Sequence, residues 1–133
     1  MRKYIAELIG TFALIFCGTG AIIINQESGG AITHVGIAIT FGLIVTTMIY
    51  TIGDISGAHL NPAVTIAFWA AKEFPVKDIL PYIVSQGIGA VLASFTLHIL
   101  LNQPPLILLN AVIRCFEKEV IHPQYLRKYK FFS

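Results

Sequence analysis

Three residues near the middle of the chain are of the types that hydrolytic enzymes use. Asp54, Ser56 and His59 could supply the acid, nucleophile and base of a triad. They lie within six residues of one another, which makes triad geometry hard to reach, and no G-x-S-x-G turn surrounds the serine. A metal site from Asp54, His59 and Asp78 is equally unsupported, because nothing in their spacing fixes a ligand count. The sequence therefore predicts no enzyme, no metal site and no cofactor.

Asn61 and Pro62, which follow directly, have a clearer structural chemistry. Asn is among the best N-cap residues, and Pro is favoured at the first position of a helix. The pair predicts a helix that starts here and runs through mostly apolar residues to about Ala71. At 1.5 Å per residue, about ten residues cover roughly 15 Å, which is half the hydrocarbon thickness of a bilayer. This length predicts a re-entrant half-helix rather than a crossing.

The predicted half-helix would act through its N-terminus. A helix N-terminus carries roughly half a positive charge, so it repels cations when it faces a narrow cavity. Asn61 can cap the helix through its side-chain oxygen and still point its amide N–H at a polar molecule in that cavity. The backbone carbonyls before the cap have no helical partner, and lining a water path would satisfy them. These carbonyls belong to Gly57, Ala58, His59 and Leu60.

The composition places this stretch inside a membrane protein. Of the 133 residues, 56% are hydrophobic and only 12% are charged, with a mean hydropathy of +0.76. Soluble domains carry about 25% charged residues. A crossing needs about 20 helical residues, and three windows meet this length: 5–24, 32–52 and 79–101. We expect an all-α membrane protein with three transmembrane helices and one re-entrant loop and half-helix over residues 54–71, with the lipid bilayer and no nucleic acid as partner.

The placement of positive charge predicts the orientation. The first connection, residues 25–30, contains no Lys or Arg, whereas Arg2, Lys3, Lys72 and Lys77 flank the opposite ends of the crossings. Positive residues concentrate on the cytoplasmic side of a membrane. We therefore expect a multi-pass protein with a cytoplasmic N-terminus and a re-entrant half-helix that enters from the cytoplasmic side. We also expect its location to be the plasma membrane.

Two polar residues inside the predicted crossings need partners. Glu7 lies in the first crossing, where an ionisable group is costly and normally faces a partner or a cavity. Either it extends toward the nearby interface beside Lys3, or it braces the re-entrant loop through a hydrogen bond to His59 or to the loop backbone. Gln86 in the third crossing could brace the loop in the same way or form an ordinary interhelical hydrogen bond.

The last residues have a different character. Residues 102–133 hold five of the nine Lys and Arg residues, and their apolar run is too short to span a bilayer. With three crossings, this basic segment would lie outside the cell, against the usual bias. We expect it to be a divergent tail that is poorly ordered or lies at the membrane interface.

Three motifs resemble those of the aquaporin, or major intrinsic protein, family. Residues 56–65 read SGAHLNPAVT, residues 6–12 read AELIGTF, and residues 85–90 read SQGIGA. The resemblance covers residues 1–101 and implies one half of a six-helix bundle built from two inverted halves. It also implies a channel for water or small neutral solutes such as glycerol, commonly assembled as a tetramer. Asn61, Pro62 and Ala63 match the family's first signature, and Phe41 falls where the family places part of its extracellular constriction, with a lean toward water.

One departure from the family pattern is large. A complete member has a second Asn-Pro-Ala followed by an arginine, whereas Asn61-Pro62 is the only Asn-Pro pair in this chain. We therefore expect a truncated channel that is inactive alone, because its second half is missing and its positive charges favour a single orientation. The alternative is a non-conducting membrane fragment or interaction subunit.

Overall fold

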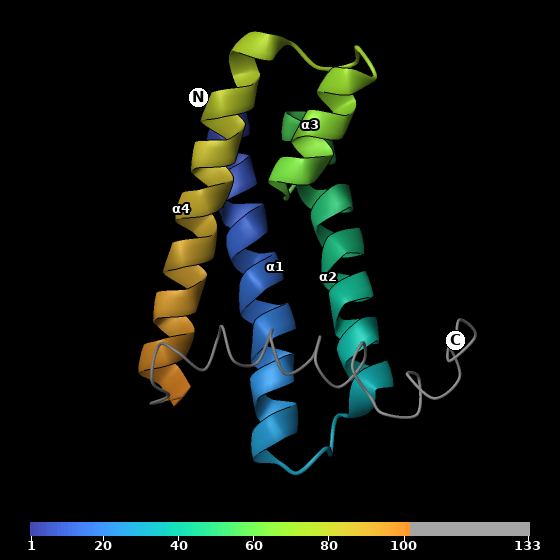
Figure 1. Cartoon of the computed structure of the whole chain (residues 1–133), viewed down its shortest axis with the longest axis vertical. Helices are drawn as coiled ribbons and strands as arrows, with labels where there is room; N and C mark the ends of the chain where they lie inside the picture. The colour runs from blue at the N-terminus through green and yellow to red at the C-terminus, as the bar shows by residue number, and fades with distance from the viewer. Residues whose placement is uncertain (102–133) are drawn as a thin grey trace, which may run out of the picture.

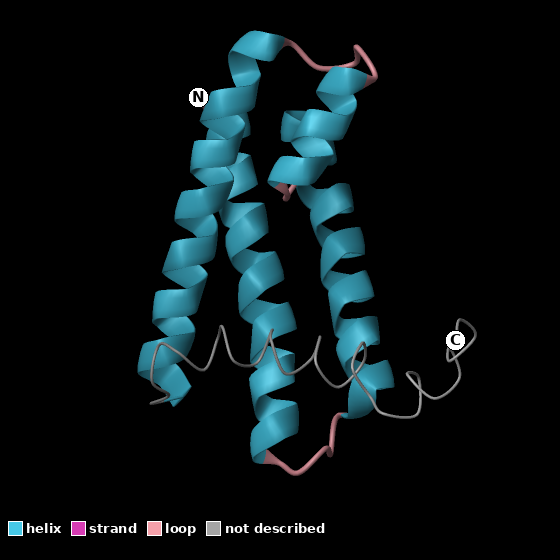
Figure 2. Cartoon of the chain, viewed as in Figure 1, coloured by secondary structure: helices cyan, strands magenta, loops and turns pink. Residues whose placement is uncertain are grey.

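The computed structural model describes residues 1–101, and every regular element within them is a helix (Figure 1, Figure 2). α1 spans Arg2–Glu27, α2 spans Thr33–Ser56, α3 spans Pro62–Ala70 and α4 spans Val76–Leu101. The three long helices are each long and apolar enough to cross a membrane. This confirms the predicted fold class of three transmembrane helices and one short helix. The expectation for the tail, 102–133, lies outside the described residues.

The helices extend beyond the apolar windows from which they were predicted. α1 begins at Arg2 instead of residue 5, and α4 at Val76 instead of residue 79, because a helix can continue into polar residues at the membrane surface. Residues 54–56, which were expected in the re-entrant loop, form the last turn of α2. That helix ends at Gly57, whose φ of 85° is a left-handed conformation that glycine adopts without steric cost. The connection to α3 is therefore shorter than predicted.

α1 is the central helix of the bundle. It packs against both α2 and α4, while α3 packs against α4 (Figure 1). The share of each helix's apolar window that is buried follows this arrangement. It is 44% for α1, 22% for α4 and 6% for α2. Most of the apolar surface of α2 therefore remains uncovered by the described residues.

The interface between α1 and α4 depends on a close backbone approach. A Cβ atom placed on Gly89 of α4 would overlap the backbone carbonyl oxygen of Leu8 and lie 3.2 Å from the backbone nitrogen of Phe12. Small residues permit such contacts where lipid provides no hydrophobic drive for helix association. The buried face of α4 repeats at helical spacing and consists of Asp78, Tyr82, Gln86, Gly89, Ala93 and Leu97.

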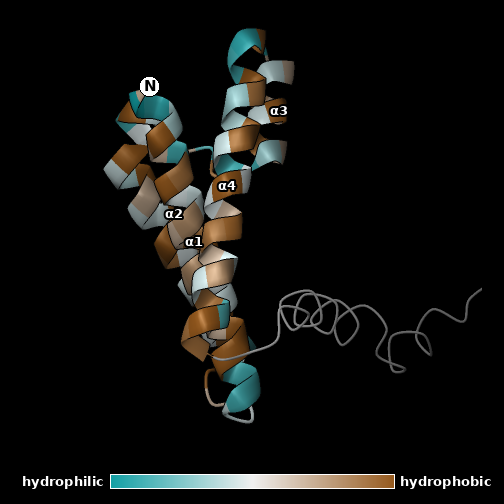
Figure 3. Cartoon of the chain, turned by 90° about the vertical axis from the view of Figure 1, so that its left-hand side faces the viewer, coloured by the Kyte–Doolittle hydropathy of each residue, from teal (hydrophilic) through white to brown (hydrophobic). Residues whose placement is uncertain are grey.

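The short helix α3 occupies only one half of the bundle's length. It lies in the half that holds the N-terminus, and its first residues lie at mid-height beside α2 (Figure 1). Its nine residues span about 14 Å at 1.5 Å per residue. Hydrophilic residues gather at the two ends of the bundle, with mainly hydrophobic residues between them (Figure 3). The N-terminus of α3 thus lies within the apolar belt.

Candidate functional site

The N-terminus of α3 is capped by Asn61. Its backbone is extended, with φ −152° and ψ 132°, and its side-chain Oδ1 accepts a 2.8 Å hydrogen bond from the backbone N–H of Ala63. Pro62 occupies the first helical position, where its missing N–H has no cost. Asn61 is exposed, and its Nδ2 amide has no hydrogen-bond partner within residues 1–101. The cap therefore leaves a free donor at the positive end of the helix.

The loop before the cap has an unusual backbone. Gly57, Ala58 and Leu60 all have positive φ angles, of 85°, 47° and 55°. Left-handed backbone at Ala and Leu is uncommon and costs about 1–2 kcal/mol per residue. Such strain persists only where surrounding contacts hold it, and it is often found at functional sites.

Glu7 of α1 supplies the main contacts to the loop. Its Oε1 accepts from the Ser56 hydroxyl at 2.7 Å and from the His59 backbone N–H at 2.9 Å. Its Oε2 accepts from the Leu60 backbone N–H at 2.7 Å and from Gln86 Nε2 at 2.8 Å. A carboxylate offers about four lone-pair sites, so this set of donors uses its full capacity. Glu7 therefore joins α1, the loop and α4.

The side chain of Glu7 does not extend to the interface. It is completely buried, at 0% exposure. Lys3, its neighbour one turn earlier, instead forms an ion pair of 2.6 Å with Asp78 Oδ2, and the Tyr4 hydroxyl donates to Asp78 Oδ1 at 2.8 Å. The end of α1 that holds the N-terminus is thus tied separately to the start of α4.

Gln86 bridges the loop and the short helix. Its Nε2 donates to Glu7 Oε2 and, at 3.1 Å, to the hydroxyl oxygen of Thr65 in α3. The Thr65 hydroxyl in turn donates to the backbone carbonyl of Asn61 at 3.2 Å. The cap and the carboxylate of Glu7 are therefore linked through one chain of hydrogen bonds. The Oε1 atom of Gln86 is buried and has no partner among the described residues.

The imidazole of His59 lies in an aromatic enclosure. It stacks on Phe68 with ring centroids 4.7 Å apart, and the rings of Phe74 and Tyr82 lie at 4.8 and 5.2 Å. Its Nδ1 is 3.1 Å from the Thr65 hydroxyl. The residue is buried, at 7% exposure. The ring therefore fills the space behind the loop and links it to α3.

Leu60 is held from two sides by α1. Its backbone carbonyl accepts a 3.3 Å hydrogen bond from the Thr11 hydroxyl, and its side chain is 4% exposed. A Cβ atom on Gly10 would overlap the Leu60 side chain and lie 2.7 Å from Ile52 Cδ1, so glycine makes room for both. Of the four carbonyls expected to line a path, that of Leu60 is thus satisfied by the protein. Those of Gly57, Ala58 and His59 have no hydrogen bond from residues 1–101.

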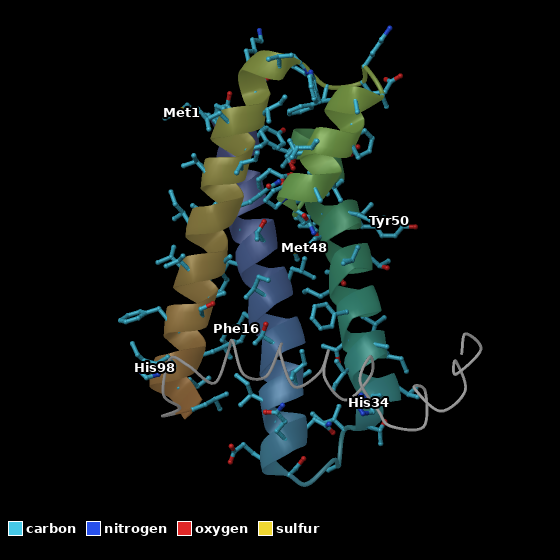
Figure 4. The ribbon with its side chains drawn as sticks, in the orientation of Figure 1. Met1, Phe16, His34, Met48, Tyr50 and His98 are labelled. Atoms are coloured by element: carbon cyan, nitrogen blue, oxygen red, sulfur yellow. The ribbon has the colours of Figure 1, made fainter. Side chains whose placement is uncertain are left out.

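Phe41 lies on α2, away from the cap. It is half-buried, on the side of α2 that faces α1. Met48, on the same side, also points toward α1, whereas Tyr50 points outward (Figure 4). The ring of Phe41 lies directly against α1 at Gly18, where a Cβ atom would be 2.8 Å from Phe41 Cε2.

The residues that were considered for a catalytic triad or a metal site make other contacts. The Ser56 hydroxyl donates to Glu7 and the His59 ring pairs with Thr65, so these two groups do not pair with each other. Asp54 is exposed, and Asp78 is engaged by Lys3 and Tyr4. No cluster of three or more potential metal ligands occurs within residues 1–101.

Sequence reasoning missed Tyr82 and Thr65. The Tyr82 hydroxyl donates to the Ser56 backbone carbonyl at 2.8 Å, and its side chain is 1% exposed. A usable signal was present, because Asp78, Tyr82 and Gln86 are spaced four apart and therefore share one face of α4. Thr65 is the last residue of the SGAHLNPAVT motif, but its type gave no indication of a role, since a threonine in a short apolar helix is common.

Comparison of the sequence with known proteins points to one family. The sequence profile described as "Major intrinsic protein" matches residues 1–126, beyond the range over which the motifs were read. The chain is similar to "Aquaporin NIP1-1" of Oryza sativa subsp. japonica, with 49% identity over 100 residues, which is 75% of this chain and 35% of that protein.

Two further relatives give the same picture. "Nodulin-26" of Glycine max is 46% identical over 100 residues, covering 75% of this chain and 37% of that protein. "Probable aquaporin NIP4-2" of Arabidopsis thaliana is 49% identical over 104 residues, covering 78% of this chain and 37% of that protein. The chain thus spans about a third of the length of these curated relatives.

Proposed function

Because this chain belongs to the major intrinsic protein family, whose members are channels and not enzymes, we propose that it forms part of a membrane channel for water or small neutral solutes such as glycerol. The observation that carries the proposal is the end of α3. There the Asn61 amide, at the positive end of this half-length helix, is exposed and has no partner among the described residues. The helix α3 begins at mid-height of the bundle (Figure 1).

The mechanism follows from the polarity of this end. A water or alcohol hydroxyl accepts a hydrogen bond from Asn61 Nδ2 and donates to the free carbonyls of Gly57, Ala58 and His59. These groups replace the hydrogen bonds that the solute loses on leaving bulk water. Cations meet the positive end of the helix instead and are disfavoured there. The expected selectivity is for neutral, hydrogen-bonding molecules.

The other site residues keep this end in place or narrow the path. Glu7, Gln86 and His59 brace the loop through the contacts described above. Pro62 and Ala63 complete the cap. Phe41 forms one wall of an outer constriction, a role that rests on the family resemblance and on its position on α2.

The channel is proposed to need two half-helices. The described residues supply one, and the family builds its pore from two inverted halves. We propose a plasma-membrane location, a cytoplasmic N-terminus and assembly into a homo-oligomer, each by analogy with the family and with the charge placement of Lys3, Lys72 and Lys77. The uncovered surface of α2, whose apolar window is only 6% buried, supports a partner on that side.

A liposome assay tests the proposal. The chain is reconstituted alone or with a separately expressed C-terminal half of "Aquaporin NIP1-1", and stopped-flow light scattering records shrinkage in an osmotic gradient and re-swelling with glycerol. We expect flux only when both halves are present. Fast flux from the chain alone would overturn the two-half requirement. No flux in the combined liposomes, with assembly shown by co-purification, would favour a non-conducting interaction subunit.

A further inference from the structure

Two glycines of α1 make room for side chains from other segments. Gly10 receives Leu60 of the re-entrant loop and Ile52 of α2, whereas Gly18 receives the ring of Phe41. The three atoms nearest to a Cβ added at Gly18 are all ring atoms of Phe41, namely Cε1, Cζ and Cε2. Any side chain at position 18 must therefore displace this ring.

Helical glycines of the chain differ in whether another group occupies the space of their missing Cβ atom. Gly42, the neighbour of Phe41 in α2, and Gly87 of α4 have no atom within 4 Å of an added Cβ. Gly18 is also buried, whereas Gly42 is exposed. A glycine costs a helix roughly 1 kcal/mol relative to alanine. The contact with Phe41 gives a physical reason for accepting that cost at position 18.

The direction in which the ring would move follows from its surroundings. One edge of the Phe41 ring lies against the α1 backbone, and the residue is only half-buried. A side chain at Gly18 blocks the α1 side, so the ring would have to move away from Gly18. In the proposed channel, where Phe41 forms a wall of the outer constriction, that movement narrows the solute path.

We propose that Gly18 is the positioning residue for Phe41 and thereby sets the size limit of the outer constriction. With glycine at position 18, the ring lies back against α1 and leaves room for a solute of glycerol size. With a larger residue, the ring projects into the path and passes water in preference to glycerol. This role rests on the proposed channel function. The packing of the Phe41 ring against Gly18, which we call its seating, does not.

The seating is tested without any flux measurement. Thermal unfolding of the full chain in detergent micelles is compared for wild type, Gly18→Ala, Phe41→Ala and the double variant, with Gly42→Ala as the matched control. We expect Gly18→Ala to lower Tm by several degrees in the presence of Phe41 and to have little effect in the Phe41→Ala background. An equal loss in both backgrounds, or an equal loss in Gly42→Ala, would overturn the seating.

The size limit is tested in liposomes that hold the chain and the complementary half. Gly18→Ala should lower the glycerol-to-water permeability ratio by about tenfold, equivalent to about 1.4 kcal/mol in barrier. The double variant should have the same glycerol-to-water permeability ratio as Phe41→Ala. The control Gly42→Ala should have the same ratio as wild type. A purely structural defect would lower both permeabilities in proportion, which overturns the role in selectivity. If no variant conducts, the channel proposal and this role both fail, and the unfolding cycle alone decides the seating.

Discussion

At the scale of single residues, the buried carboxylate of Glu7 is the centre of the candidate site. It is fully buried and accepts four hydrogen bonds, two of them from backbone N–H groups of the strained loop. Those two bonds oppose the conformational cost of the left-handed residues Ala58 and Leu60. The carboxylate is therefore the group on which the loop geometry most depends.

Replacing Glu7 with Gln should destabilise the fold. The substitution replaces one carboxylate oxygen by an NH₂ group, which donates hydrogen bonds and cannot accept them. If Oε1 is replaced, the NH₂ group faces the donors Ser56 Oγ and His59 N; if Oε2 is replaced, it faces Leu60 N and Gln86 Nε2. Each buried donor left without an acceptor costs about 1–3 kcal/mol. Equilibrium unfolding in micelles measures the loss. Glu73→Gln, the same change at an exposed residue, is the control, and equal stability of the two variants would contradict the brace.

A charge change at Asn61 tests the electrostatic mechanism. Asp caps helices as well as Asn does, so Asn61→Asp should keep the fold while adding a negative charge at the positive end of α3. We expect a higher cation leak in liposomes that conduct water, measured with a sodium or proton indicator. Asn25→Asp, in the last turn of α1, makes the same chemical change away from α3 and serves as the control. An unchanged leak in Asn61→Asp would remove the support for the dipole argument.

At the scale of elements, the central helix α1 organises the site by contacts along several turns. Glu7 and Thr11 bind the loop, Gly10 receives Leu60, and Gly18 receives Phe41. Its opposite partner α4 approaches closely enough for Gly89 to contact the backbone of α1. A shift of α1 against α4 would therefore move Glu7 relative to Gln86 and disturb the loop.

Gly89 and Gly87 form a matched pair for testing this helix contact. A Cβ at Gly89 overlaps the carbonyl oxygen of Leu8, whereas one at Gly87 has no atom within 4 Å. We expect Gly89→Ala to cost about 1–3 kcal/mol through overpacking. Gly87→Ala should be neutral or stabilising, since alanine is favoured in helices by about 1 kcal/mol. Equal unfolding free energies for the two variants in micelles would show that the helices can separate freely at this point.

At the scale of the whole molecule, the bundle is covered unevenly. α1 is surrounded by α2 and α4, while α2 exposes large apolar side chains such as Val35, Leu43 and Tyr50, at 67%, 64% and 87%. The exposed Asn61 amide and the free loop carbonyls are also left without partners in the described residues. This arrangement is consistent with one half of a channel, in which lipid and a second half cover the remaining surfaces.

The sequence by itself determined the elements and the start of the half-helix. Spanning helices follow from the length of apolar runs, and the cap follows from two adjacent residues, Asn61 and Pro62, so both are local properties. It also indicated Glu7 and Gln86 as polar residues that need partners inside a membrane. Their positions relative to the loop were left open, with two alternatives for each.

The tertiary structure decided which of these residues meet. Glu7 binds Leu60 across 53 residues and Gln86 across 79 residues, and no local pattern encodes such pairings. The same holds for the contact of the Phe41 ring with Gly18 and for the ion pair between Lys3 and Asp78. Both depend on how α1 packs against α2 and α4. The left-handed conformation of Leu60 is likewise set by distant contacts, because an isolated leucine avoids it.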